Sequence, residues 1–280
     1  MRTLPGILLI AVVGLVVLGH GRANGTGPNR KGSAMSSIQY LANYEKKGLT
    51  LVITVNDVVL ERWESPARQQ SGGPLNMWLR PGPNRIRLRG QVAEGATPRV
   101  DLTIVAASSD ASAAQRSVAH LSWPPANTQP KTIDEQLTFV PEPVPPSDLW
   151  GKAQPITLDA VSRAAILATV SQLHQAATQK NLDRMMTLTE FQAVDTGRSL
   201  YMPAEKARSS GRDFLADGMQ GKWSVEPWEP QKAELNLVED GLLAAVTVGG
   251  KPPIRIQMAE ARFEIPVFVA HVDGKWIIAR

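Results

Sequence analysis

The spacing of apolar residues changes once along this chain, and this change constrains the fold more than any other feature. Up to about residue 140, apolar and polar residues alternate, as in "LTLVITV" at residues 49–55. A period of two is typical of strands that bury one face. After residue 153, apolar residues recur every three to four positions, as in the stripe Ile166, Val170 and Leu173. This second period is typical of an amphipathic helix, so the chain is expected to contain an all-β part followed by an α+β part.

Prolines mark the boundary between these two patterns. Eight prolines lie between Pro124 and Pro155, and residues 141–148 read "PEPVPPSD". Proline lacks a backbone N–H and has a fixed φ, so this stretch forms neither helix nor central strand. We therefore predict an extended, semi-rigid linker at residues 141–152, between a β-sandwich domain at 38–140 and an α+β domain at 153–280. A chain of 280 residues has room for two domains of ordinary size.

The N-terminus has the pattern of an export signal. Arg2 precedes an apolar stretch at residues 4–19, and the small residues Gly21 and Ala23 stand three and one positions before a candidate cleavage site. Residues 1–23 are predicted to be a secretory signal peptide or, alternatively, an uncleaved N-terminal membrane anchor. Residues 24–37 are polar and lack periodicity, which predicts a flexible tether. The expected location is the periplasm or the medium or, with an uncleaved anchor, the periplasmic side of the inner membrane.

Composition excludes several classes of chemistry. The chain has no cysteine, which excludes disulfides, thiolate catalysis, cysteine zinc sites and a cysteine-linked lipid anchor. The formal charge is +4, from 30 basic and 26 acidic residues. Two of the basic residues, Arg2 and Arg22, lie in the predicted signal segment, and without them the charge is +2. This balance is too small to indicate nucleic-acid binding.

The N-terminal half shows short alternating segments separated by turn residues. The segment "LNMWLRPGPNRIRLRG" at residues 75–90 predicts a hairpin whose turn is "PGPN". With few helical signals, the pattern predicts an antiparallel β-sandwich. The seven expected strands are residues 49–55, 58–63, 75–79, 85–89, 99–107, 117–123 and 136–140.

Two of these segments, "VNDVVL" at 55–60 and "LNMWLRPGPNRIRLRG" at 75–90, resemble small jelly-roll or fibronectin-like sandwich modules of exported bacterial proteins. The resemblance implies a module that binds sugars, binds proteins or acts as a spacer. Arg85, Arg87 and Arg89 share one face of their strand. They form either a surface for an acidic ligand or a solvated face whose charge protects a sheet edge.

The C-terminal half begins with helical patterns and ends with strands. Residues 157–179 predict a first helix, with Thr157 as the N-cap and Asp159 in the first turn. Residues 181–191 and 202–221 predict two further helices. Strand patterns follow up to the end of the chain, with hairpin signals at Asp240-Gly241 and Asp273-Gly274. We expect three helices and then a curled antiparallel sheet.

The segments "DAVSRAAILATVSQLHQAATQKNLDRMMTLT" and "FVAHVDGKWIIAR" in this order resemble the NTF2-like superfamily, also called cystatin-like α+β cones. Many members of that superfamily end in a strand, a "DG.W.I" turn and a closing strand. The resemblance implies that helices cover one face of a curled sheet and that the other face is free, often as a dimer surface. It also implies a cavity at the mouth of the cone.

The strand at residues 265–272 is apolar on both faces. Ile265, Val267, Val269 and His271 point one way, and the other face is formed by Pro266, Phe268, Ala270 and Val272. The first face is expected to pack on the helices, so the second face needs a partner of its own. We predict an interface at Pro266, Phe268, Ala270 and Val272, occupied by a second copy, by the sandwich or by another protein.

Chemistry-bearing motifs are absent from the sequence. There is no nucleophile elbow, phosphate-binding loop, dinucleotide fingerprint or paired-histidine zinc motif, and no two histidines have metal-ligand spacing. No catalytic residue, metal or cofactor is predicted. The residues expected to line a cone pocket are His174, Tyr201, Trp223 and Trp276. His174 is either an acid–base group or a residue at the edge of the core, and the aromatic residues are either pocket walls or core.

The first hypothesis is an exported, non-enzymatic interaction protein of the bacterial envelope, such as an immunity protein or an accessory factor of a secretion or envelope complex. It would bind a protein partner or a second copy through the C-terminal sheet. One alternative is a small-molecule enzyme or ligand carrier, with His174, Tyr201 or Asp195 facing into the cone. The other alternative is a glycan-binding sandwich, which requires Trp63 or Trp78 to be exposed.

Overall fold

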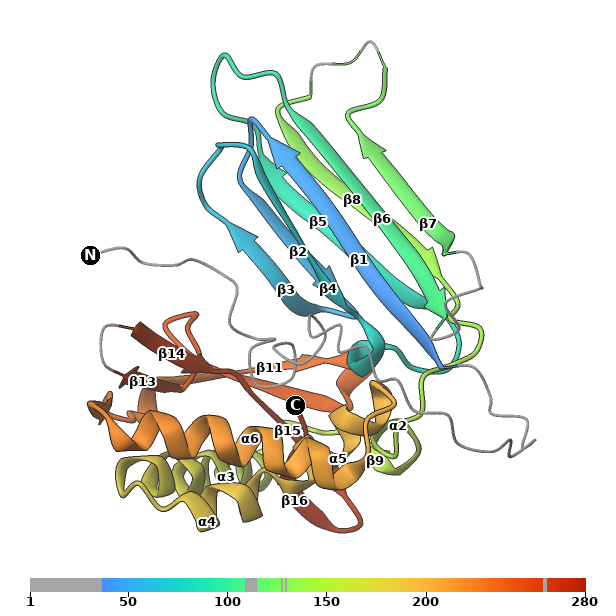
Figure 1. Ribbon diagram of the computed structural model, residues 1–280. Helices are drawn as coiled ribbons and strands as arrows, with labels where there is room; N and C mark the ends of the chain where they lie inside the picture. The colour runs from blue at the N-terminus through green and yellow to red at the C-terminus, as the bar shows by residue number, and fades with distance from the viewer. Residues whose placement is uncertain (1–36, 109–114, 127, 129, 259–260) are drawn as a thin grey trace, which may run out of the picture.

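The computed structural model describes residues 37–108, 115–126, 128, 130–258 and 261–280 (Figure 1). The predicted signal segment at 1–23 and nearly all of the predicted tether at 24–37 lie outside these ranges. Within them, the chain combines several antiparallel sheets with helices, so the expected mixed α+β character is confirmed.

Two four-stranded antiparallel sheets form the N-terminal half. Their orders are β4-β1-β6-β7 and β3-β2-β5-β8. Figure 1 shows the two sheets stacked like a sandwich, and we call residues 38–139 the sandwich. Apolar residues that alternate along the strands, such as Ile53, Ile86 and Leu102, are fully buried in its core. The strands are β1 (Ile38–Lys47), β2 (Leu51–Val55), β3 (Val58–Trp63), β4 (Gln69–Pro74), β5 (Asn84–Gln91), β6 (Arg99–Ser108), β7 (Arg116–Trp123) and β8 (Thr132–Phe139).

The predicted strand at residues 75–79 is wrong. Residues Asn76–Trp78 form a single 3-10 turn, η1, and every residue from Leu75 to Leu79 is buried. The side chain of Asn76 replaces the hydrogen bonds of a strand ladder: its Oδ1 accepts from Tyr40 N at 2.7 Å, and its Nδ2 donates to Ile38 O at 2.9 Å. Alternation of apolar and polar residues indicates a strand when one face is buried and the other is exposed. Here every residue of the segment is buried, so the alternation does not indicate a strand.

The proline-rich stretch contains neither helix nor strand at residues 141–148. A short helix, α2 (Leu149–Lys152), follows it. Leu149 is fully buried, and Trp150 packs against the same core. The stretch therefore runs back into the fold at its C-terminal end and is fixed there.

Helices and two antiparallel sheets form residues 149–280, which we call the C-terminal unit. The sheet orders are β11-β12-β15-β16, with β9 also paired to β15, and β10-β13-β14. The helices are α3 (Ala160–Thr178), α4 (Leu182–Leu188), α5 (Glu190–Ser199) and α6 (Ala204–Gln220). The strands and short turns are β9 (Ala153–Gln154), β10 (Trp223–Val225), η2 (Pro230–Lys232), β11 (Ala233–Val238), η3 (Glu239–Gly241), β12 (Leu243–Val248), β13 (Ile254–Met258), β14 (Ala261–Ile265), β15 (Val267–Val272) and β16 (Lys275–Ile278).

Two helix predictions need correction. Asp159, not Thr157, is the N-cap of α3, because its carboxylate accepts a hydrogen bond from Ser162 N at 2.7 Å. Residues 181–191 were expected to form one helix. Instead α4 ends and α5 begins at Thr189, whose hydroxyl donates to Met185 O at 2.9 Å. The chain changes direction at this break, so α5 turns away from α4 (Figure 1).

The hairpins predicted at Asp240-Gly241 and Asp273-Gly274 are confirmed, whereas the one predicted at residues 75–90 is wrong, because β5 pairs with β2 and β8 and not with residues 75–79. Asp240 and Gly241 have φ values of 53° and 86° between β11 and β12, and Asp273 and Gly274 have φ values of 49° and 74° between β15 and β16. Asn56 and Asp57, with φ of 47° and 71°, likewise join β2 to β3. Short polar residues and glycine tolerate this left-handed region, which two-residue hairpins require.

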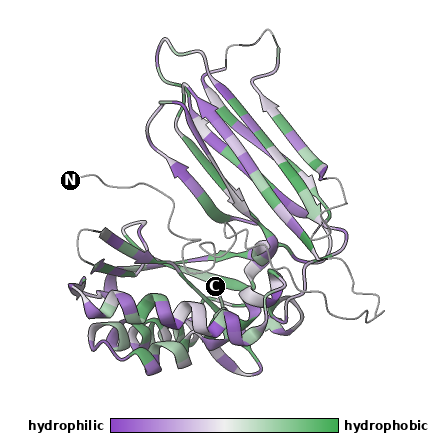
Figure 2. Cartoon of the chain, in the orientation of Figure 1, coloured by the Kyte–Doolittle hydropathy of each residue, from purple (hydrophilic) through white to green (hydrophobic). Residues whose placement is uncertain are grey.

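The sandwich and the C-terminal unit meet at a contact that we call the seam. In Figure 1 the C-terminal sheets lie between the helices and the sandwich. Figure 2 shows hydrophobic residues interleaved with hydrophilic ones along the sandwich strands. One continuous buried cluster contains sandwich residues together with Val238, Leu243, Phe268, Ala270, Val272 and Ala279. The core is therefore shared across the seam.

Candidate functional site

A cavity of about 140 Å³ lies where α4, α5 and α6 meet β14, β15 and η1. Its walls are mostly apolar. Four of the chain's eight methionines line it, namely Met77, Met185, Met186 and Met202. The other apolar lining residues are Trp78, Leu173, Ala193, Gly197, Ala207, Gly211, Leu215, Phe263, Ile265, Pro266 and Phe268.

Methionine side chains give this cavity an adaptable wall. They are unbranched and polarisable, so they fill irregular spaces and make favourable sulfur–aromatic contacts. Met185 is fixed in the core, whereas Met186 and Met202 are half-buried. The cavity therefore has both rigid and adjustable walls.

Small residues hold α5 and α6 close together beside the cavity. A Cβ placed on Gly197 would lie 2.5 Å from the Cβ of Ala207, which is too close for two carbon atoms. The approach of the two helices therefore requires glycine at position 197. Since Gly197 and Ala207 both line the cavity, the same packing shapes its wall.

The sandwich supplies one side of the cavity through η1. Met77 and Trp78 both line it, and the ring of Trp78 packs edge-on against Phe268 with ring centres 5.2 Å apart. Asn76 ties this turn to the C-terminal unit, because its Nδ2 donates to Ser199 O at 3.0 Å. The cavity is thus complete only when the sandwich is docked.

Arg280 brings a positive charge to the cavity. The residue is 3% exposed, and its Nε donates to Met77 O at 2.9 Å. Its Nη2 lies 2.7 Å from Asp195 Oδ2, and its guanidinium carbon lies 5.4 Å from the centre of the Trp150 ring. Burial lowers the pKa of Arg280, and the neighbouring carboxylate of Asp195 opposes this effect.

Asp195 is held by hydrogen bonds from several elements. It accepts from Ser147 Oγ at 2.7 Å and from Asp148 N at 2.5 Å, in addition to Arg280. Leu149 N lies 3.4 Å away as a weaker donor. Asp195 does not line the cavity. Its carboxylate anchors the end of the proline-rich stretch and neutralises Arg280, so it is not an inward-facing acid of the kind that the enzyme hypothesis requires.

The remaining lining residues are polar but hold no reactive pair. They are Thr189, Gln192, Thr196, Ser210 and Glu264. Glu264 is partly exposed, and its Oε1 lies 3.2 Å from Arg262 Nε. Among the described lining residues, the charged ones are Arg280 and Glu264, and both are ion-paired. The arrangement can enclose and orient a molecule, but it contains no nucleophile next to a base.

The four residues expected to line a cone pocket lie outside this cavity. His174 Nε2 is 2.7 Å from Glu226 O on the far side of α3. Trp223 donates from its indole nitrogen to Ala177 O at 2.9 Å. Both side chains are used to join α3 to neighbouring segments.

The other two expected pocket residues lie elsewhere in the C-terminal unit. Trp276, on β16, packs against His271 with ring centres 4.9 Å apart. Tyr201 follows α5 with a φ of 58° and is half-buried. None of His174, Tyr201, Trp223 and Trp276 thus contributes to the wall of the cavity.

The predicted interface residues are divided between the cavity and the seam. Pro266 and Phe268 line the cavity, while Phe268, Ala270 and Val272 belong to the core shared with the sandwich. Of the three occupants considered for this face, the sandwich is the one that covers Phe268 in the structure, through Trp78.

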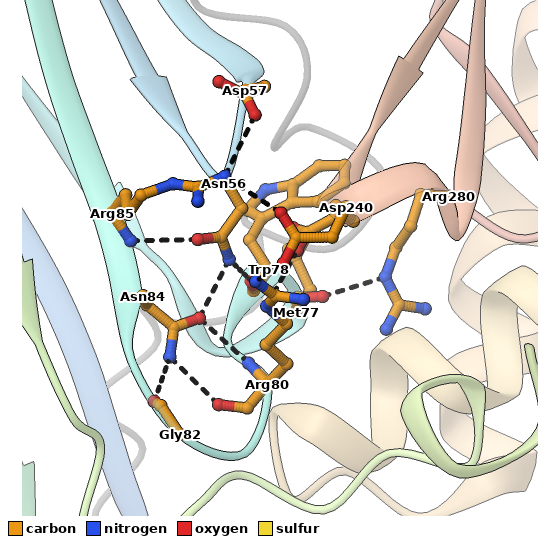
Figure 3. A network of polar contacts seen from close by, with 11 residues as sticks. Asn56, Asp57, Met77, Trp78, Arg80, Gly82, Asn84, Arg85, Asp240 and Arg280 are labelled. Carbon is orange, nitrogen blue, oxygen red and sulfur yellow. Dashed lines mark hydrogen bonds and ion pairs between the residues drawn. The ribbon is translucent and has the colours of Figure 1, made fainter. Parts of the chain in front are cut away.

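A polar network crosses the seam near the cavity (Figure 3). Asn56 Nδ2 donates to Trp78 O at 3.1 Å and to Asn84 Oδ1 at 2.9 Å. Arg80 and Arg85 both pair with Asp240, the latter at 3.0 Å. Turns of the sandwich are thus tied to the β11–β12 turn of the C-terminal unit.

Glu239, beside this network, is an unusual buried carboxyl group. It is fully buried, and neither of its side-chain oxygens has a hydrogen-bond partner within the described structure. Its nearest charged neighbour is Arg80, with Nε 3.8 Å from Oε2. Burial raises the pKa of Glu239 to about 9, although Arg80 opposes this shift.

Two hypotheses for the sandwich concerned a surface for acidic ligands and a glycan-binding face. Arg87 makes two contacts of 2.6 and 2.7 Å with Asp134, and Arg89 lies 3.5 Å from the same carboxylate. Asp134 balances one of these two positive charges and both arginine side chains are partly exposed, which favours a solvated face over a surface for acidic ligands. Trp63 and Trp78 are 6% and 3% exposed, so the condition for glycan binding through them is not met.

Sequence reasoning missed the residues that build the cavity. Neither the methionines nor Arg280 was singled out. Met77, Met185 and Met202 are far apart in the chain and come from different elements. The enrichment of methionine near residues 185–202 was the only available signal, and it does not indicate a cavity by itself.

No family model, curated protein or solved structure matches this chain. The resemblances to sandwich modules and to NTF2-like cones therefore stay predictions. In the part of the chain that the structure describes, no helix has the length and apolar character needed to cross a membrane. The same part contains no cluster of three or more histidine, aspartate or glutamate side chains arranged to hold a metal.

Proposed function

We propose that this protein is a non-enzymatic binding protein that holds a small, mostly apolar molecule in the methionine-lined cavity. The observation that carries this proposal is the cavity itself, with a volume of about 140 Å³ and largely apolar walls. An engineered apolar cavity of about 150 Å³ in another protein binds benzene. The proposed ligand therefore has a body of roughly six to ten non-hydrogen atoms.

The character of the lining supports binding rather than catalysis. General acid–base catalysis needs a titratable group within hydrogen-bond reach of the reacting atoms. The described lining residues that carry charge, Arg280 and Glu264, are engaged with Asp195 and Arg262. Methionine side chains can adjust to the shape of a ligand without reacting with it.

The geometry gives less support to a protein partner or a homodimer on the C-terminal sheet. Phe268 and Val272 are buried, and Trp78 of the same chain packs on Phe268. A partner at this place would have to displace the sandwich. Export to the periplasm or the medium remains our prediction from residues 1–23, and a role in the cell envelope would place the cavity there.

A titration of the full chain with benzene tests the proposal. Methionines labelled with ¹³C in the methyl group report binding by NMR. We expect benzene to shift the signals of the lining residues Met77, Met185, Met186 and Met202. Met219 and Met258 pack in the core of the C-terminal unit but do not line the cavity, so their signals should stay in place.

Two matched substitutions locate the binding site. Ala193→Phe adds a ring at a lining position, whereas Val161→Phe adds a ring on α3 at a side chain that is 78% exposed. Filling the cavity should abolish the benzene-induced shifts, and the exposed change should preserve them. Absence of any shift at the lining methionines of the wild type would overturn the proposal, as would unchanged shifts in a folded Ala193→Phe variant.

A further inference from the structure

We propose that the cavity selects an uncharged ligand, because the charged side chains that reach it are already paired with the protein's own groups. This inference rests on the proposed function and specifies its ligand class. A buried charge is stable only with a partner of opposite sign and with hydrogen bonds. The question is therefore whether the cavity wall offers a free charge to a ligand.

The positive charge at the wall is Arg280, and it is already satisfied. Its side chain is 1% exposed, and that of its partner Asp195 is 3% exposed. Nε donates to Met77 O, Nη1 donates to Ala279 O at 3.0 Å, and Nη2 donates to Asp195. Nη2 also lies 3.4 Å from Ser147 Oγ. Little of the guanidinium remains for a ligand anion.

Asp195 cannot turn away to release Arg280. Its two oxygens also accept hydrogen bonds from Ser147 Oγ and Asp148 N, which fix the carboxylate in place. An anionic ligand beside Arg280 would therefore compete with Asp195 for a single positive charge. The weaker competitor is the ligand, because Asp195 is held by the fold in the required position.

The remaining charged groups give no free partner either. Glu264 at the wall pairs with Arg262, which weakens its attraction for a cationic ligand, although Arg262 also pairs with Glu226 at 2.7 Å. Glu239, whose charge would act on Arg280, has a pKa raised to about 9 by burial and is mostly neutral at pH 7. The paired wall thus offers hydrogen bonds, from Thr196, Ser210 and Gln192, without offering net charge.

Three probes with one skeleton test this inference. Benzyl alcohol, benzoate and benzylammonium differ in charge at pH 7 and have similar sizes. Each is titrated into the full chain, with the methyl signals of the lining methionines as the readout. We expect benzyl alcohol to bind at least about tenfold more tightly than either ion, because each ion would be buried without a free counter-charge.

Charge-removing variants should change this order in opposite directions. Asp195→Asn frees the charge of Arg280, so the preference for the alcohol over benzoate should fall by about tenfold or reverse. Arg280→Gln leaves Asp195 without its cation, so the affinity for benzylammonium should increase instead. Asp183→Asn removes an exposed partner of Arg212 and is the control, with the wild-type order expected.

The outcomes separate this inference from the proposed function. If neither benzene nor any of the three probes shifts the methyl signals of the lining methionines, the proposed function fails. If benzene and benzoate both bind and benzoate binds more tightly than benzyl alcohol, the cavity exists but the inference of an uncharged ligand is overturned. The wild-type order decides this even if Asp195→Asn or Arg280→Gln fails to fold.

Discussion

At the scale of single residues, Glu239 is a carboxyl side chain that has no access to water. It is fully buried, its carboxyl oxygens have no hydrogen-bond partner within the described structure, and its pKa is raised to about 9. An unfolded chain restores the ordinary glutamate pKa of about 4.3. The folded state therefore binds an additional proton between about pH 4.3 and 9, so the free energy of unfolding falls as pH rises through this range.

Glu239→Gln should remove this pH dependence, because the amide keeps the shape of the protonated carboxyl group. We expect the variant to be more stable than the wild type at pH 8 by on the order of 1–3 kcal/mol, with a difference that shrinks towards pH 5. Urea unfolding at pH 5, 7 and 8 measures it. Glu234→Gln, at an exposed position on β11, is the control and should follow the wild type. The prediction would be contradicted if the free energy of unfolding changed with pH in the same way for Glu239→Gln and the wild type.

At the scale of elements, the 3-10 turn η1 decides how the two halves fit together. It is only three residues long, yet it contributes Met77 and Trp78 to the cavity and places Trp78 against Phe268 on β15. Asn76 fixes the turn on both sides, through Ile38 O in the sandwich and Ser199 O in the C-terminal unit. A substitution of Trp78 or Phe268 should therefore change the packing energy of the other ring across the seam.

A double-mutant cycle on Trp78→Leu and Phe268→Leu measures this contact. Each single change should lower the free energy of unfolding, and the two should be coupled by about 0.5–1.5 kcal/mol, as expected for rings in edge contact. Trp63→Leu combined with Phe268→Leu is the control, and its effects should be additive. Trp63 packs on Tyr44, at the end of β3 that lies away from the turn at Asn56. Additive effects for Trp78 and Phe268 would show that the seam does not transmit packing energy between them.

The same contact changes how substitutions on β15 are understood. A charge placed at Phe268 to disrupt a partner surface would instead separate β15 from Trp78 and open the core of the seam. Loss of a binding partner in such a variant would therefore report damage to the fold. The cavity-filling and charge-removing variants are better suited to test function, since they leave Trp78 and Phe268 in place.

At the scale of the whole molecule, the seam joins the sandwich and the C-terminal unit through a shared core. Apolar residues of both halves share one buried cluster, and Arg280 joins Met77 of the sandwich to Asp195 of α5. Ser147 and Asp148, at the end of the proline-rich stretch, bond the same carboxylate. A single ion pair thus links three segments that are distant in the chain.

Arg280→Met should test this linkage. It leaves Asp195 buried without its cation, so we expect a loss of about 3–5 kcal/mol in the free energy of unfolding. Adding Asp195→Asn should recover part of the loss. Arg212→Met removes a partner of the exposed Asp183 and should cost no more than about 1 kcal/mol. Equal losses for Arg280→Met and Arg212→Met, measured by urea unfolding, would show that the buried pair does not hold the seam.

The predictions that succeeded depend on neighbouring residues only. The hairpins at Asp240-Gly241 and Asp273-Gly274 were predicted because short polar residues and glycine accept positive φ. One error was local, a choice between two neighbouring cap residues, and the other arose from contacts with distant groups. Asp159 rather than Thr157 caps α3, and Asn76 turns residues 76–78 into a 3-10 helix by bonding to Tyr40, Ile38 and Ser199.

The sequence by itself determined the change from a period of two to a helical period, the proline-rich stretch between them, the hairpin turns and the absence of cysteine chemistry. These features follow from backbone preferences and composition, which act within a few residues. Only the tertiary structure decided that the sandwich covers Phe268, that Met77, Met185 and Met202 share one cavity, and that Arg280 is neutralised by Asp195. The physical reason is that cavities and buried ion pairs depend on residues far apart in the chain, which no local pattern brings together.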